Sequence, residues 1–95
     1  MNSEFEMYEQ GNNLIIELEV PGLSSDEIEV FVEGDYLRVE GKREISKEAR
    51  LKGFYIKEAK SNNFLKQIGL PVNVIGERAK TEFLGNKIII TLPKQ

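Results

Sequence analysis

The chain has 95 residues, a formal net charge of −3 from 13 Lys and Arg against 16 Asp and Glu, and neither cysteine nor histidine. This length predicts a single domain over residues 1–95. The composition excludes a disulfide framework, a thiolate zinc site and any catalytic pair built on imidazole. The acidic balance disfavours nucleic-acid binding, and no apolar run approaches the ~20 residues that span a bilayer. Because residues 1–12 lack an apolar signal core, we expect a cytoplasmic protein.

The first predicted strands are a short one at residues 5–9 and a clear one at residues 14–20. In the second strand every other residue is apolar, while Glu17 and Glu19 lie on the opposite face. That alternation is typical of a half-buried strand. Pro21-Gly22 is predicted to stop it.

A short turn and a hairpin come next along the chain. Ser24 with Glu27 matches a capping box, but no apolar helix follows, so we expect one turn at most. Residues 28–32 form the next predicted strand. Gly34-Asp35 favours a type II′ hairpin turn, because glycine accepts a positive φ at the first turn position. Residues 36–41 return as its partner strand.

The second half shows the same alternation. Strands are predicted at residues 64–70, 79–84 and 87–92, with Asn62-Asn63 as a turn and Gly85-Asn86 as a second hairpin turn that begins with glycine. Short strands with regular turn signals and no helical repeat predict an all-β fold, an antiparallel β-sandwich.

A long connection at about residues 42–61 interrupts this pattern. Residues 42–51 are strongly charged and are expected to form either a helical turn or a mobile loop, and Phe54-Tyr55-Ile56 is an apolar, β-prone patch. Structureless connections longer than about 12–15 residues are uncommon and often functional. The residues leave two alternatives: the patch pairs with another chain by strand addition, or it folds back on its own sandwich.

Six segments in chain order carry a family resemblance. They are residues 6–9, 18–22, 24–30, 32–43, 64–71 and 88–94. The most specific is Leu18-Glu19-Val20-Pro21-Gly22, which resembles an A-D-L-P-G motif. Together they resemble the small heat shock proteins, whose core is the α-crystallin domain. The resemblance implies an immunoglobulin-like antiparallel β-sandwich.

The resemblance also implies two interaction surfaces. In the non-animal branch, the long loop carries a strand that pairs with an edge strand of a neighbouring subunit, which makes a reciprocal dimer. The dimer-interface residues implied here are Phe5, Met7, Tyr8, Phe54, Tyr55, Ile56, Lys57 and Glu58. A groove for C-terminal tails or client segments is implied at Ile28, Val30, Val32, Ala79, Thr81 and Phe83. Burial in the core is the competing interpretation for Val30 and Val32.

Several features depart from the family pattern. Ala59 stands where arginine is usual, and Lys66 and Gln67 occupy a region where arginine is common, so a forked guanidinium contact at the interface is not expected there. Family members normally carry an N-terminal arm and a C-terminal tail with an I-x-I motif. The sequence is therefore expected to be a core that lacks both, without the large oligomer.

The predicted function is that of an ATP-independent chaperone, a holdase that acts as a strand-exchanged dimer on non-native client proteins. It needs no catalytic residue, metal or cofactor, and no nucleic-acid or membrane partner is expected. The alternative is a monomeric adaptor of the co-chaperone sandwich type. A hydrolase built on Glu17 and Glu19 would be a third class, but alternating glutamates normally form a solvated face. A calcium site at Asp26, Glu27 and Glu29 lacks the loop that such sites require.

Overall fold

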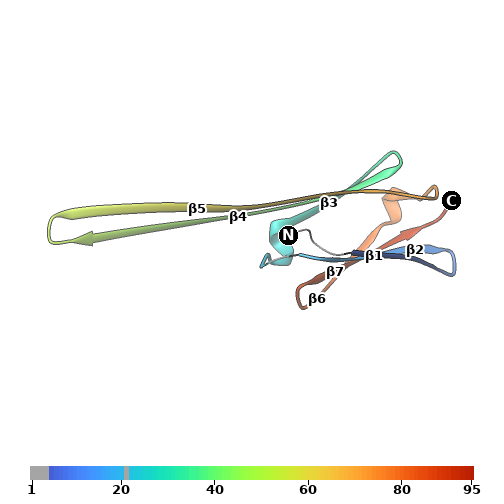
Figure 1. Cartoon of the computed structure of the whole chain (residues 1–95), viewed down its shortest axis with the longest axis horizontal. Coiled ribbons are helices and arrows are strands. Elements are labelled where there is room, and N and C mark those ends of the chain that lie inside the picture. Colours follow the sequence, from blue (N-terminus) through green and yellow to red (C-terminus); the bar gives the residue numbers. More distant parts are fainter. Residues whose placement is uncertain (1–4, 21) are drawn as a thin grey trace.

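Seven strands and two short 3₁₀ helices build the chain in this computed structural model, which describes residues 5–20 and 22–95. The elements are β1 (Phe5–Gln10), β2 (Asn13–Glu19), η1 (Ser25–Glu27), β3 (Ile28–Glu33), β4 (Tyr36–Leu51), β5 (Phe54–Gly69), η2 (Gly76–Arg78), β6 (Lys80–Leu84) and β7 (Lys87–Pro93). They form two antiparallel sheets, ordered β1-β2-β7-β6 and β3-β4-β5 (Figure 1). The predicted antiparallel sandwich is therefore confirmed, while the predicted stop at Pro21 lies outside the described residues.

The core lies between the two sheets and follows the predicted alternation. Its fully enclosed side chains come mainly from β2, β7 and the first part of β4, and each is 4% exposed or less: Leu14, Ile16, Leu18, Leu37, Val39, Ile68, Ile88, Ile90 and Leu92. Burying each such side chain stabilises the fold by about 1.5–3 kcal/mol. Ile15, expected on the outer face of its strand, is also buried, because β2 lies between β1 and β7 and neighbours cover it on both sides.

The two hairpin turns that begin with glycine are confirmed. Gly34 and Gly85 have φ values of 59° and 64°, and neither residue that follows them has a positive φ, as a type II′ turn requires. Another tight turn, at Lys52-Gly53, was not predicted. Both of its residues have positive φ, at 45° and 85°, which is the signature of a type I′ turn.

The long connection differs most from its prediction. Residues 42–51 continue β4, and Asn62-Asn63 lies inside β5 opposite Lys42 and Arg43, so the expected loop and the expected turn are both wrong. The two strands run in continuous antiparallel register, and each supplies the backbone hydrogen-bond partners that a loop would lack. We call residues 42–63 the arm.

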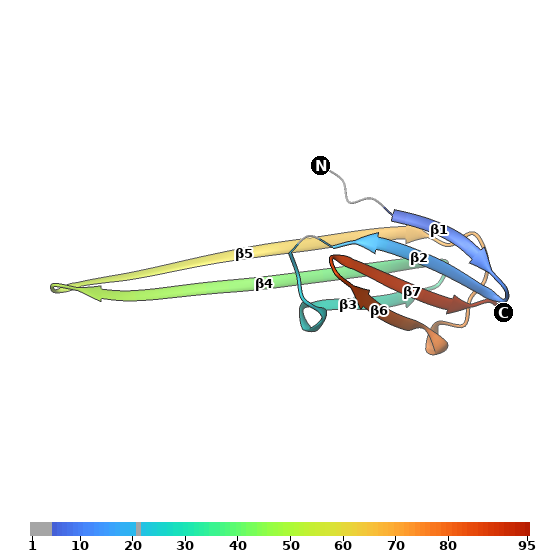
Figure 2. The same cartoon turned by 90° about the horizontal axis from the view of Figure 1, so that it is seen from below.

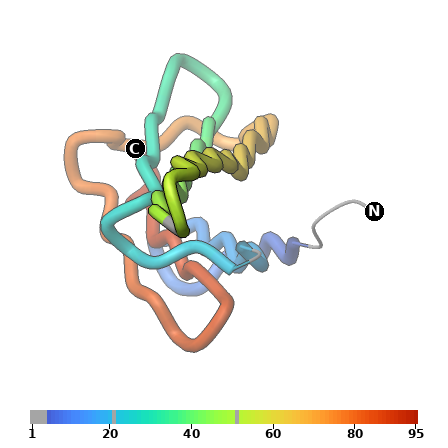
Figure 3. Tube along the Cα trace, turned by 90° about the vertical axis from the view of Figure 1, so that its left-hand side faces the viewer, coloured from blue at the N-terminus to red at the C-terminus, as the bar shows by residue number. Residues whose placement is uncertain are grey.

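The arm projects beyond the sandwich. The molecule measures 64 × 23 × 23 Å, and Figures 1 and 2 show that the arm accounts for its long dimension. Figure 3, which looks along that dimension from the end of the arm, shows the arm continuing the layer of β3, β4 and β5. The apolar patch at residues 54–56 lies at the far end, and Phe54 is 71% exposed. In this chain the patch does not fold back on its own sandwich.

Candidate interaction surfaces

An open groove lies between β3 and β6, the edge strands of opposite sheets. Its volume is about 540 Å³, and it contains all six residues expected from the family resemblance: Ile28, Val30, Val32, Ala79, Thr81 and Phe83. Ser25, Gly76 and Ile88 complete the lining. Val30 and Val32 are half-buried, so they pack against the core and still present surface to the groove. The structure therefore brings these side chains together around one opening, which is lined by both apolar and polar surface.

A second surface is the free edge of β1. Within the described residues β1 pairs only with β2, so its other edge is open. Phe5 and Tyr8 are exposed, whereas Met7 packs partly against the core. The Tyr8 hydroxyl donates a hydrogen bond of 2.6 Å to Glu17 Oε2, which raises the pKa of Tyr8. The hydrogen-bonding groups on this edge are available to an added strand.

The tip of the arm is the third surface. Phe54, Tyr55 and Ile56 are exposed, and so are Lys57 and Glu58. The residues expected to pair with this segment lie on β1, at the other end of the molecule (Figure 1). One chain therefore does not bring the two halves of the expected dimer interface together.

Both faces of the arm mix apolar and charged side chains. The strand register places Ile45, Ala49, Phe54 and Ile56 on the face that continues the core side of the sheet, together with Arg43, Lys47, Glu58, Lys60 and Asn62. The opposite face carries charged side chains, including Lys42 and Glu44, which form an exposed ion pair of 3.1 Å. The first of these faces continues the core side of the sheet, but its side chains other than that of Arg43 are exposed wherever their burial is described.

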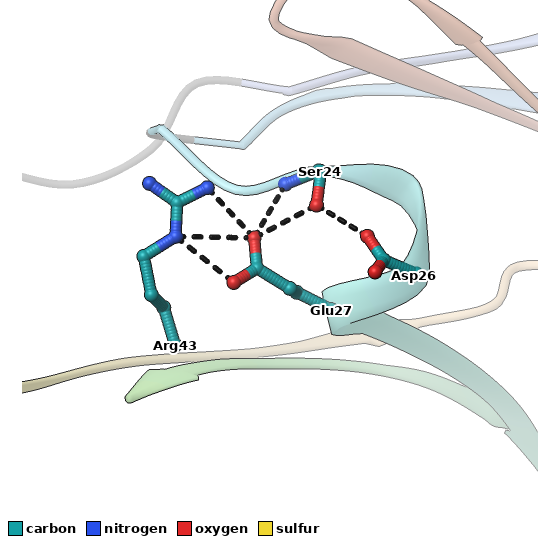
Figure 4. A network of polar contacts seen from close by, with 4 residues as sticks. All are labelled: Ser24, Asp26, Glu27 and Arg43. Atoms are coloured by element: carbon teal, nitrogen blue, oxygen red, sulfur yellow. Dashed lines mark hydrogen bonds and ion pairs between the residues drawn. The ribbon is translucent and has the colours of Figure 1, made fainter. Parts of the chain in front are cut away.

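Sequence reasoning missed the polar cluster at the base of the arm, which Figure 4 shows. The Arg43 guanidinium donates from Nε to both oxygens of Glu27, at 2.9 and 3.2 Å, and from Nη2 to Oε1 at 2.8 Å. The Ser24 backbone N–H donates to the same Oε1 at 2.8 Å, as the capping box predicted. Hydrogen bonds from Arg43, and then from the Ser24 backbone, lower the pKa of Glu27 from 4.5 to about 2.

The acidic residues considered for chemistry are engaged elsewhere. Glu17 accepts hydrogen bonds from Tyr8 and Lys87, which lower its pKa, whereas a general acid needs a raised one. Glu27 is held by Arg43 rather than left free for calcium. In the part of the chain that the structure describes, no group of three acidic side chains could hold a metal ion.

No helix within residues 5–20 and 22–95 is long and apolar enough to cross a bilayer.

Comparison with known sequences identifies a family that matches nearly the whole chain. The Hsp20/alpha crystallin family matches residues 6–95. "Spore protein SP21" of Stigmatella aurantiaca is 32% identical over 91 residues, which cover 96% of this chain and 54% of that protein. The "17.5 kDa class I heat shock protein" of Glycine max is 28% identical over 96 residues, which cover 100% of this chain and 63% of that protein. The chain thus spans about half to two thirds of the length of these curated relatives.

Solved structures share the fold. A small heat-shock protein from Xylella fastidiosa superposes with a TM-score of 0.71 at 19% identity, covering 100% of this chain and 87% of that one. "Heat shock protein 16.0" from Schizosaccharomyces pombe gives 0.71 at 18% identity, covering 98% of this chain and 66% of that one. At these identities the likeness shows the fold alone, and it agrees with the immunoglobulin-like sandwich expected from the sequence.

Proposed function

The chain belongs to the Hsp20/alpha crystallin family, and from that premise we propose that it is the core of an ATP-independent chaperone. Residues 1–95 act as a single α-crystallin-like domain that binds exposed apolar segments of unfolding proteins and keeps them from aggregating. The observation that carries this proposal is the groove of about 540 Å³ between β3 and β6, where apolar side chains of both strands meet. The groove is open along two edge strands and can accept an extended segment of another chain.

The energetics of such a groove suit reversible capture. A client segment that buries roughly 400 Å² of apolar surface gains about 10 kcal/mol at ~25 cal/mol per Å². Lost translational and rotational freedom and side-chain ordering cost about 4–15 kcal/mol, which offsets much or all of that gain. Binding to this groove is therefore weak and reversible, and a client can leave without ATP hydrolysis. No cofactor, metal or catalytic residue is needed, so the protein is not an enzyme.

The arm supplies the dimer in this proposal. The tip at residues 54–58 adds as a strand to the open edge of β1 in a second copy, and the second copy does the same in return. Two features support this: the free edge of β1 and the exposed apolar tip. The interface residues are those that the family resemblance implied: Phe5, Met7, Tyr8, Phe54, Tyr55, Ile56, Lys57 and Glu58.

The partners are accordingly a second copy and non-native client proteins, without nucleic acid or membrane, in the cytoplasm. The alternative, a monomeric adaptor of the co-chaperone type, is disfavoured by the arm, since that type of sandwich lacks the long strand-bearing connection. A client-binding test separates the two, because an adaptor docks on one specific partner and has no general affinity for unfolded chains.

Residue-resolved NMR tests the groove directly on this 10.8 kDa chain. The probe is a reduced and alkylated, permanently unfolded protein, added without ATP. We expect chemical-shift changes along β3 and β6, and loss of binding in Val30→Glu. The control is Glu29→Gln, on the neighbouring exposed position of the same strand. Shift changes confined to other surfaces, or equal binding by both variants, would contradict the proposed site.

A further inference from the structure

The arm loses its contact with the rest of the sandwich at one place. Strand β3 accompanies β4 only from Tyr36 to Gly41, where Ile28 is the last partner. Beyond Gly41, β4 has β5 as its only strand neighbour among the described residues. A two-stranded hairpin is flexible and only marginally stable in water. Its direction relative to the sandwich therefore depends on what holds β4 at residues 41–43.

Two contacts from the connection between β2 and β3 reach β4 at this place. The first is apolar: Leu23 is 9% exposed and covers Gly41 so closely that a Cβ at position 41 would collide with Leu23 Cδ1. A larger residue at position 41 would therefore force the Leu23 side chain to move. This contact fixes the connection against β4 one residue pair before the arm begins.

The second contact is ionic and has a defined orientation. Arg43 binds Glu27 through Nε and Nη2, and Oε1 also accepts hydrogen bonds from the Ser24 backbone and from Ser24 Oγ at 2.9 Å (Figure 4). The Ser24 hydroxyl in turn contacts Asp26. A guanidinium that binds through two nitrogens fixes direction as well as distance. The side chains of Arg43 and Glu27 are only 34% and 21% exposed, so solvent competes less than it would at a fully exposed pair.

The length of the arm amplifies any error in its direction. At about 3.3 Å per residue, the part of β4 beyond Arg43 spans roughly 27 Å. A tilt of ~10° at the base would displace the tip by roughly 5 Å, which is about one full spacing between neighbouring strands. Pairing with an edge strand therefore requires the base to be held to within a few degrees.

We propose that Glu27 and Arg43, together with Leu23 on Gly41, form a clasp that sets the direction of the arm and so positions its tip for pairing with a second copy. The inference rests on the proposed arm-mediated dimer. Arg43 and Glu27 are positioning residues: they lie at the base of the arm, away from the paired segments, and act on the dimer only through the arm's direction.

Lys42 provides a matched control. It is adjacent to Arg43 and carries the same charge, but it lies on the opposite face of β4 and pairs with Glu44, away from the clasp. Lys42→Gln and Arg43→Gln therefore change the net charge equally. Only the second removes the ionic contact of the clasp.

The first measurement is the dimer dissociation constant, obtained by light scattering over a dilution series. We expect Arg43→Gln and Glu27→Gln each to raise it tenfold or more, and Lys42→Gln to change it less than twofold. The Glu27→Gln/Arg43→Gln double variant should match the single variants, because one contact is lost in all three. Unchanged dissociation constants in the clasp variants of a dimeric wild type would overturn the proposal.

The second measurement tests the clasp independently of dimerisation. The chain has no cysteine, so spin labels at Glu19→Cys and Glu48→Cys report only the distance between sandwich and arm, with excess unlabelled chain added to dilute intermolecular pairs. We expect a narrow distance distribution in the wild type and in Lys42→Gln, and a broad or shifted one in Arg43→Gln. Identical distributions in all three would overturn the clasp. If the wild type is monomeric and only Arg43→Gln shows a broad or shifted distribution, the proposed dimer is wrong and the clasp is supported.

Discussion

The sandwich and the arm share two continuous strands, β4 and β5, but only the sandwich part of those strands is covered by a second sheet. In the sandwich, Leu37 and Val39 of β4 are fully buried beneath the opposite sheet. In the arm, Ile45 and Ile56 continue the same face and remain exposed. Among residues 42–63 whose burial is described, only Arg43 is partly covered. The comparison shows that the arm keeps the strand pairing of the sandwich without the packing that buries the core.

The largest expected contrast between the two regions is in stability. Ile16→Ala, in the core, should lower the free energy of unfolding by about 2–5 kcal/mol, because it leaves a cavity between the sheets. Ile56→Ala, at the arm tip, should change it by less than about 0.5 kcal/mol in the monomer, since Ile56 is 47% exposed and does not pack against the core. Urea unfolding at concentrations below the dimer dissociation constant measures both. A comparable loss in the two variants would show that the arm packs on its own sandwich.

The next largest change in stability is expected at Gly41, where the arm leaves the sandwich. Gly41→Ala should destabilise the chain by about 1–3 kcal/mol, because the added methyl group collides with Leu23. Shortening the obstructing side chain should relieve the collision. The Leu23→Ala/Gly41→Ala double variant is therefore expected to be less destabilised than the sum of the single variants, as thermal unfolding of all four chains will show. Simple additivity would mean that the two residues do not press on each other.

The pH dependence of the clasp is the smallest effect. The pKa of Glu27 in the folded chain is about 2, below its ordinary 4.5, because Arg43 and the Ser24 backbone hydrogen-bond to the carboxylate. A lowered carboxyl pKa contributes stability above pH 4.5 and loses it as pH falls toward 2. The difference in unfolding free energy between wild type and Arg43→Gln should therefore be constant near neutral pH. It should shrink as the pH falls below 4.5. Urea unfolding at several pH values measures it, and parallel curves would contradict the assignment.

The order of apolar, polar and glycine residues along the sequence was sufficient to predict several strands and turns of the sandwich. The strands around Ile16 and Ile90 were predicted because every second side chain is apolar and one face is buried. The turns at Gly34 and Gly85 were predicted because glycine there takes a positive φ. The groove residues came from the family resemblance, and the structure places them around one opening.

The arm could not be predicted in the same way. Asn62-Asn63 suggested a turn because asparagine favours turns, but pairing with Arg43 and Lys42 overrides that preference. The true turn, Lys52-Gly53, places a lysine at positive φ, where asparagine or aspartate is the usual signal. The Glu27–Arg43 contact joins residues 16 positions apart, beyond the reach of any capping or periodicity rule.

The central claim is that the arm is completed by a second copy, and solution mass tests it most directly. Light scattering on a sizing column, over a dilution series, should give about twice the 10.8 kDa chain mass for the wild type. The Phe54→Ser/Ile56→Ser variant should give a single-chain mass, while retaining the unfolding free energy of the sandwich. A wild-type chain that stays at the single-chain mass at every concentration would contradict the claim.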